Sequence, residues 1–372
     1  MKNLNKLKKR KVETPKKQMT FRELEKLSDL HYLNLNLNSL EDLKDYPNPL
    51  LNRSKDDYLH PEKEILRFMR DPDYFWFTCK YVLNIDLLPF QALVLKKLYT
   101  HNFPMLIGCR GFSKTFLLAV YTILVMLVKP GSKVALIGSG FRQSKLIFEY
   151  IEKIWLNAPV LQDMASNSVR KSGTKKEADK WSFVFGDSIA YALPVGNDGS
   201  RIRGLRATHL ICDEFASQNP HIYENVIAGF ANVSANPVRN VQEKAKIEFF
   251  KKQGLWTEQQ EKNYLKNKQR NQTILSGTAF YATNHFCHYF ERYRAIINSR
   301  GDKEKLREIF KNDVSSNFNW EDYCIIRVPY DKLPADFMDA DQIERARAMI
   351  SHHLFAMENL CIFSRDSDGF FK

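Results

Sequence analysis

The fold of this chain is decided by the stretch Gly108-Cys-Arg-Gly-Phe-Ser-Lys-Thr115. It lies between an apolar run, PMLIG, which ends at Gly108, and a long apolar segment, TFLLAVYTILVMLV, which begins at Thr115. A phosphate-binding loop needs small residues whose backbone N–H groups surround a phosphate. It also needs a Lys that reaches further oxygens and a hydroxyl for Mg²⁺, all at a helix N-terminus. Lys114 and Thr115 supply the last two, so the sequence predicts a strand, a phosphate-binding loop and a helix.

One position of this loop departs from the strict pattern, which requires Gly where the chain has Ser113. We expect Gly111 to supply some of the missing backbone freedom. Arg110 is a candidate cation for the nucleotide of its own subunit. The alternative is an ordinary Gly-containing turn with a chance Lys-Thr, and the flanking apolar segments argue against it. The expected nucleotide-binding loop residues are Gly108, Cys109, Arg110, Gly111, Phe112, Ser113, Lys114 and Thr115.

A second motif, His209-Leu-Ile-Cys-Asp213-Glu214, is an apolar strand that ends in two acids. The carboxyl end of such a strand places both carboxylates at the edge of the sheet where the phosphate loop also lies. Asp213 can then hold Mg²⁺ together with Thr115, and Glu214 can polarise an attacking water. Alone this pattern is common by chance, but it gains weight from its position about 100 residues after the loop.

Two shorter segments complete the predicted site. Arg201 and Arg203, just before the acidic strand, are candidates for an arginine finger that reaches the nucleotide of a neighbouring subunit; a solvated loop is the alternative. Ser276-Gly277-Thr278 ends the strand TILSG, where small hydroxyl residues can contact the γ-phosphate or its water. For these three residues the alternative is an ordinary strand-ending turn.

The remaining pattern indicates an α/β fold, a P-loop NTPase whose central, mainly parallel sheet is flanked by helices. We expect the strand of the acidic pair to neighbour the phosphate-loop strand. WSFVF and SIAYAL, around Gly186-Asp187, predict a hairpin. A single helix is expected over residues 341–360. His285, Cys287 and His288 have no second ligand pair at zinc spacing, so we expect a partly packed helix there.

Together, GCRGFSKT, GSRIRGLRATHLICDEFA and LSGT resemble, in order and spacing, the ATPase domain of a viral (tailed-phage) terminase large subunit, from about Tyr81 to the C-terminus. The resemblance implies an ATP- and Mg²⁺-dependent motor that moves double-stranded DNA into a procapsid. It implies a homo-oligomeric ring, a viral portal and a terminase small subunit as partners, and the host-cell cytoplasm as location. Lys114 and Thr115 would be the Walker A pair and Asp213 the Walker B acid. Glu214 would be the catalytic carboxylate, and residues 276–278 the motif that couples hydrolysis to DNA movement. Phe90 and Gln91 would match the adenine-contacting segment.

Composition along the chain gives the expected arm and insertion, and the same resemblance gives the ATPase domain and its end. Residues 1–60 would be a basic flexible arm and linker, with a short helix near Phe21–Leu27. Residues 61–365 would be the ATPase domain, including a small helical lid or insertion at 241–270. Residues 366–372 would begin a linker to a nuclease domain that this chain lacks, so we expect ATP hydrolysis without DNA cleavage.

Composition limits the alternatives. The 372 residues carry 56 Lys and Arg against 43 Asp and Glu, which favours a polyanionic partner, although eight of the basic residues lie within residues 1–17. The 44% hydrophobic content excludes disorder throughout. No apolar run reaches the roughly 18 residues that cross a membrane, and six cysteines without a CxxC pair indicate free thiols. A helicase-like ATPase and a non-enzymatic nucleic-acid-binding scaffold remain the alternative functions.

Overall fold

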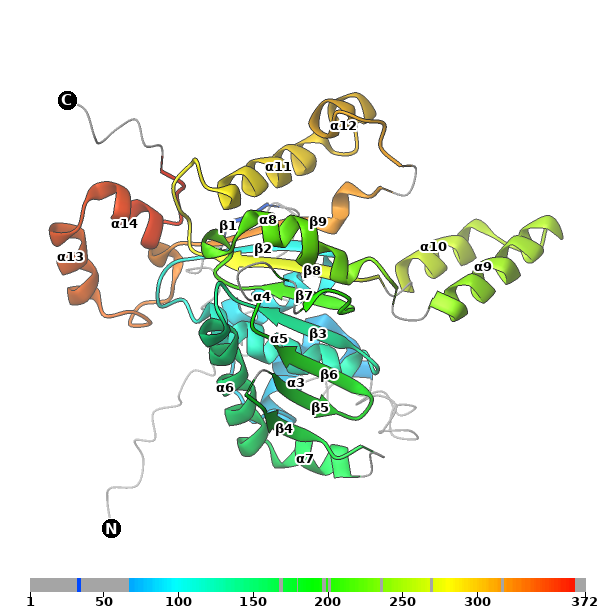
Figure 1. Ribbon diagram of the computed structural model, residues 1–372, viewed down its shortest axis with the longest axis horizontal. Helices are drawn as coiled ribbons and strands as arrows, with labels where there is room; N and C mark the ends of the chain where they lie inside the picture. The colour runs from blue at the N-terminus through cyan, green and yellow to red at the C-terminus, as the bar shows by residue number, and fades with distance from the viewer. Residues whose placement is uncertain are drawn as a thin grey trace, which may run out of the picture.

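A nine-stranded sheet forms the centre of the chain (Figure 1). The computed structural model describes residues 32–34, 67–166, 170–178, 180–195, 199, 202–234, 237–267, 270–315 and 318–364. In spatial order the strands are β1 (Tyr32–Asn34), β9 (Tyr323–Val328), β2 (Phe103–Gly108), β8 (Gln272–Gly277), β7 (His209–Cys212), β3 (Lys133–Ile137), β6 (Ser188–Ala192), β5 (Trp181–Phe185) and β4 (Gly173–Lys176).

In this spatial order, the seven strands β1-β9-β2-β8-β7-β3-β6 pair in parallel. The pairs β6-β5 and β5-β4 are antiparallel. The predicted mainly parallel sheet is therefore confirmed, and so is the hairpin, because β5 and β6 pair antiparallel across Gly186-Asp187. The central strands are continuous apolar runs, as expected where helices cover a parallel sheet. All four residues of β7 are buried.

The predicted position of the acidic strand is wrong, because β8 lies between β2 and β7. Leu106 of β2 is paired with Ser276 of β8, and Leu210 of β7 with Thr273 of β8. Chain order cannot reveal this arrangement, because β8 follows β7 in sequence by about 60 residues and yet lies between two strands that precede it in the chain. The insertion places Ser276-Gly277-Thr278 between the phosphate loop and the acidic pair.

Helices flank the sheet: α6 and α7 lie beside its β4–β6 end, and α11 and α12 beside its β9 end (Figure 1). Helix α5 is the most apolar, and every side chain from Leu117 to Met126 is buried. The α-helices are α3 (Phe75–Tyr81), α4 (Pro89–Thr100), α5 (Lys114–Val128), α6 (Phe141–Asn157), α7 (Pro159–Ser166), α8 (Pro220–Ile222), α9 (Pro237–Lys252), α10 (Glu258–Asn267), α11 (His285–Ser299), α12 (Lys303–Phe310), α13 (Ala340–Met349) and α14 (His352–Glu358). Within the described residues, no helix is both long enough and apolar enough to cross a membrane.

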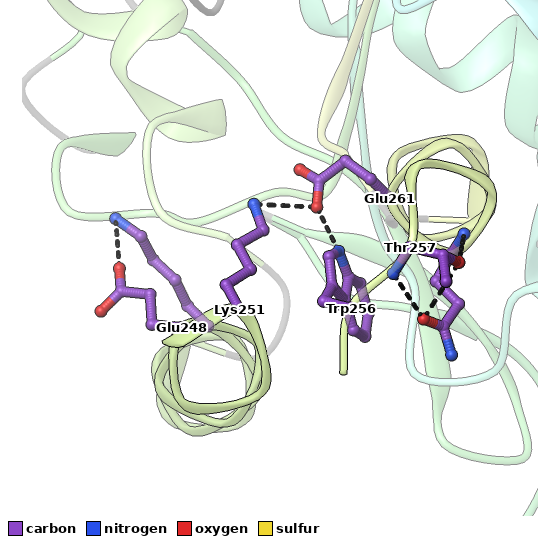
Figure 2. A network of polar contacts seen from close by, with 7 residues as sticks. Glu248, Lys251, Trp256, Thr257 and Glu261 are labelled. Carbon is purple, nitrogen blue, oxygen red and sulfur yellow. Dashed lines mark hydrogen bonds and ion pairs between the residues drawn. The ribbon is translucent and has the colours of Figure 1, made fainter. Parts of the chain in front are cut away.

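The described part of segment 241–270 is mostly helical, as expected: α9 and α10 form a hairpin that projects from the body (Figure 1). Figure 2 shows how the hairpin is held together. Glu261 of α10 pairs with Lys251 of α9 at 2.9 Å and accepts a hydrogen bond from the indole of Trp256 in the connection. Thr257 directly precedes α10, and its backbone N–H donates to Gln260 Oε1 at 2.8 Å. Polar contacts thus join the two helices, together with an edge-to-face contact between the Trp256 and Tyr264 rings.

Two further expectations need correction. The single helix over residues 341–360 is wrong: Ile350 is extended (φ −101°, ψ 159°), and the Ser351 side chain accepts from the Leu354 N–H, so it caps a separate helix, α14. Residues 32–34, expected to lie in the flexible arm, form β1 and pair with β9, since their alternating sequence suits a strand once a partner edge is available. The helix expected near Phe21–Leu27 lies outside the described residues.

Candidate nucleotide-binding site

The phosphate loop connects β2 to α5 with two residues in the left-handed region. Gly111 has φ +84°, and Ser113, at the N-cap of α5, has φ +72° and ψ 31°. Ser113 occupies the position at which the strict pattern has Gly. The left-handed backbone conformation costs roughly 1 kcal/mol for a residue with a side chain. The loop therefore keeps the backbone conformation that the pattern demands, with Ser in place of Gly.

Lys114 points into the loop. Its Nζ donates to Gly108 O at 3.0 Å, to Cys109 O at 3.3 Å and to Thr278 Oγ1 at 3.1 Å. The side chain is only 8% exposed. An ammonium group with three oxygen acceptors is fixed where a nucleotide phosphate would meet the loop amides. The contact with Thr278 also joins the loop to the end of β8.

Asp213 lies at the end of β7, 2% exposed, between two hydroxyl groups. Thr115 Oγ1 donates to its Oδ2 at 3.4 Å and Ser276 Oγ to its Oδ1 at 3.1 Å. Burial raises the pKa of this carboxyl, while Lys114 and the hydrogen bonds oppose the rise. A carboxylate next to a Thr hydroxyl is an oxygen donor set that suits Mg²⁺, which usually takes one or two carboxylates together with substrate phosphates. Thr115 and Asp213 therefore fit the metal that the sequence predicts.

Glu214, the next residue, has an unusual backbone conformation, with φ 48° and ψ 48°. Its side chain is partly exposed. Burial raises the pKa of its carboxyl, as do the charges of Asp213 and Glu358, whereas Lys114 and Arg110 lower it. A carboxylate at the carboxyl edge of the sheet with a raised pKa has the properties of a general base that accepts a proton from water.

Arg110 is tied to helix α14. Its backbone N–H donates to Glu358 O at 2.8 Å, and its guanidinium lies 3.8 Å from the Glu358 carboxylate. The Arg110 side chain is 83% exposed. A Cβ on Gly111 would lie 3.1 Å from Met338 Cε, so the segment after β9 also covers the loop. Sequence reasoning missed Glu358 and Met338, because their approach to the loop depends entirely on tertiary structure.

The side chains of Phe90 and Phe112 lie in the core. The Phe90 ring, 1% exposed, lies 5.6 Å from that of Phe112 and 5.4 Å from that of Phe337. Gln91 Oε1 accepts from the Leu88 N–H at 2.9 Å and thereby caps α4. The structure places Phe90 directly beneath the loop, and the adenine contact of Phe90 and Gln91 stays a prediction. Cys109 is also buried, which raises the pKa of its thiol to about 12.

The candidate arginine finger lies in an exposed loop. Arg203 is exposed beside Gly204, which has φ +86°, while Ile202, 2% exposed, anchors this loop in the core. The hydroxyl of Tyr191 donates to Arg206 O at 2.8 Å and fixes the other end. Arg201 lies outside the described residues. The role of both arginines remains a prediction.

Ser276-Gly277-Thr278 connects the two halves of the site. Ser276 contacts Asp213 and Thr278 contacts Lys114, as described above. Gly277 lies so close to its neighbours that a Cβ would come within 3.1 Å of the Phe286 ring and 3.4 Å of the Phe215 nitrogen. One network of hydrogen bonds thus runs from the phosphate loop through the end of β8 to the acidic pair.

Gln218 is a further residue that sequence reasoning missed. Its Nε2 donates to Asp213 O at 2.9 Å and to Ile137 O at 3.2 Å. It therefore links the end of β7 to the end of β3. No pattern in the sequence identifies it.

Comparison with solved structures finds bacteriophage large terminases. The chain is similar to them. The ATPase domain of the Thermus phage P74-26 large terminase aligns with 79% of this chain and 98% of its own length, at 14% identity and a TM-score of 0.47. The large terminase of a thermophilic bacteriophage aligns with 74% of this chain and 53% of its own length, at 10% identity and a TM-score of 0.46. That of bacteriophage HK97 aligns with 75% and 51%, at 15% identity and a TM-score of 0.42.

The chain thus spans about half the length of the last two proteins. The thermophilic-phage protein has also been solved in complex with ADP and with ATP-γ-S. No protein-family model matches this chain, and no curated protein sequence does.

Proposed function

We propose that this chain is the ATP-hydrolysing motor of a viral terminase, which translocates double-stranded DNA into a procapsid. The observation that carries the ATPase part is the hydrogen-bonded network at the carboxyl edge of the sheet. In it Lys114 contacts Thr278, and Asp213 contacts both Thr115 and Ser276. An ordinary Gly-containing turn would not explain why these five polar side chains meet at the carboxyl edge of the sheet.

The chemistry follows from these positions. The loop amides and Lys114 bind the β- and γ-phosphates, and Thr115 and Asp213 hold Mg²⁺, which neutralises phosphate charge when bound. Glu214 orients a water in line with the γ-phosphorus and accepts its proton. An Arg from a neighbouring subunit, Arg201 or Arg203, stabilises the charge that develops in the transition state. This contribution reaches on the order of 10³–10⁵ in rate in related chemistry.

The packaging part of the proposal rests on the three sequence motifs that resemble the terminase ATPase domain. It includes a ring of several copies around DNA, a viral portal and small subunit as partners, and action in the host cytoplasm. The basic excess of the chain, +13 at neutral pH, suits a partner with a phosphate backbone. DNA cleavage is not part of the proposal.

Phosphate release from ATP, measured with and without double-stranded DNA, tests the enzymatic part. We expect hydrolysis by the wild type and none by Glu214→Gln, which should still bind ATP because Lys114 and the loop are intact. DNA uptake into procapsids tests the motor part. Unwinding of a forked duplex without uptake would point to a helicase, and DNA binding without phosphate release to a scaffold.

A further inference from the structure

The N-cap residue of α11, Asn284, and its first residue, His285, contact the backbone that directly follows Glu214. Asn284 Nδ2 donates to Ala216 O at 2.9 Å, and His285 Nε2 lies 2.8 Å from Phe215 O. A carbonyl can only accept, so the His285 ring must carry its proton on Nε2 in this contact. The carbonyls of both residues after Glu214 are therefore held by side chains from one helix N-terminus.

Phe215 is enclosed by the same helix and by β8. Its ring is fully buried and lies 4.8 Å from the His285 ring and 5.6 Å from that of Phe286, edge to face in both cases. Its backbone nitrogen approaches Gly277 so closely that a Cβ there would lie 3.4 Å away. On the other side of Glu214, Gln218 holds Asp213 O. The peptide units around Glu214 are thus fixed from both directions.

Glu214 needs such support because of its own backbone. Its φ of 48° and ψ of 48° lie in the left-handed region, where the Cβ of a residue with a side chain is crowded by the following carbonyl. Strain of this kind persists only where the surroundings hold it, and it is often found where a side chain must be aimed at a reacting group. The short turn after Glu214 has its own backbone bonds, from the Ser217 N–H to Glu214 O and from the Gln218 N–H to Phe215 O. Without the two side-chain donors this turn is no longer tied to α11, and the Glu214 carboxylate would move with it.

We infer that Asn284 and His285 are positioning residues that aim the Glu214 carboxylate by clamping the two peptide carbonyls after it. This inference rests on the proposed role of Glu214 in hydrolysis. Helix α11 follows Ser276-Gly277-Thr278 along the chain, and Gly277 already contacts Phe286 of that helix. The clamp therefore connects the end of β8 to the catalytic carboxylate by a route separate from Asp213.

The chain offers substitutions that remove the clamp while keeping the helix. Asn284 Oδ1 also accepts from the Phe286 N–H at 2.8 Å and caps α11. Asn284→Asp keeps this cap, because Asp is an equally good N-cap residue, but it has no N–H to give to Ala216 O. His285→Leu removes the second donor, and His285→Gln retains one. His285 also lines a hollow of about 240 Å³, which leaves room for a Gln side chain.

The experiment measures kcat of ATP hydrolysis, the Kd for a fluorescent ATP analogue and the thermal unfolding midpoint of the full chain. Asn284→Asp and His285→Leu are each expected to lower kcat about 10-fold, and together up to about 100-fold, the size of a misplacement near 1 Å. The Kd should stay within about two-fold, because the loop and Lys114 are untouched. His285→Gln should retain most of the wild-type kcat.

Asn319→Asp is the matched control, because Asn319 also caps a short helix, through the Glu321 N–H, and this helix packs beside Gly301, beyond the opposite end of α11 from Asn284. It should leave kcat unchanged. The inference is overturned if Asn284→Asp and His285→Leu both keep kcat within about two-fold of wild type. It is also overturned if His285→Gln loses as much as His285→Leu. An inactive wild type, or a fully active Glu214→Gln, would instead refute the proposed function itself.

Discussion

Ser276→Ala tests the central hydrogen bond of the site. Ser276 is fully buried and its Oγ donates at 3.1 Å to Asp213, which is itself buried. A hydrogen bond to a charged acceptor contributes about 1.5–3 kcal/mol, and its loss leaves a desolvated carboxylate with one donor fewer. We therefore expect the free energy of unfolding at neutral pH to fall by about 2 kcal/mol.

The loss should also depend on pH. Burial raises the pKa of Asp213 in the folded protein above its value in the unfolded chain. The fold therefore loses stability as the pH rises from the unfolded pKa to the folded pKa. The Ser276 hydrogen bond lowers the folded pKa of Asp213. Its removal raises that pKa and so widens the pH range over which ionisation of Asp213 destabilises the fold. The destabilisation by Ser276→Ala should accordingly be largest at neutral pH and shrink as the pH falls toward the ordinary value of 3.8, where Asp213 is protonated.

Urea unfolding at several pH values measures this effect. The matched control is Ser188→Ala, since Ser188 is equally buried but its partners, Met126 O and the Ser132 N–H, are uncharged. Its loss should not vary with pH. The reasoning is refuted if Ser276→Ala costs under about 0.5 kcal/mol at neutral pH, or if its cost has the same flat pH profile as that of Ser188→Ala.

Three further substitutions probe the rest of the site. Ser113→Gly should preserve or raise stability, by up to about 1 kcal/mol in urea unfolding, because Gly adopts φ +72° without strain; a loss above that size would contradict the strain. Glu358→Gln removes a charge that raises the Glu214 pKa, so the acid limb of the pH–rate profile should move to lower pH, and a shift upward would argue against this coupling. Arg203→Ala should hydrolyse slowly alone but regain activity when mixed with Glu214→Gln subunits, if the finger acts between subunits; failure of every mixture would exclude Arg203 from that role.

Local sequence patterns were enough to predict the strand, loop and helix around residues 108–115 and the acidic end of β7. Each of these depends on a run of apolar residues followed by a few polar ones. The lateral order of the strands could not be predicted, because the position of β8 depends on contacts between segments far apart in the chain. For the same reason no sequence pattern shows that Glu358, Gln218, Asn284 and His285 contact the site. Ser113 shows the converse case, in which a departure from the motif left the backbone conformation intact.

The position of β8 has a mechanical consequence. One end of this strand is joined to the projecting hairpin of α9 and α10, and the other end supplies Ser276 and leads to Thr278. Arg270, at the root of the hairpin, pairs with Asp322 at 2.8 Å, and Asp322 also accepts from Asn102, so this root is anchored at the near end of the sheet. Six extended residues span roughly 17 Å and stretch very little. The strand therefore forms a short covalent path from the anchored root of the hairpin to the residues that contact Lys114 and Asp213.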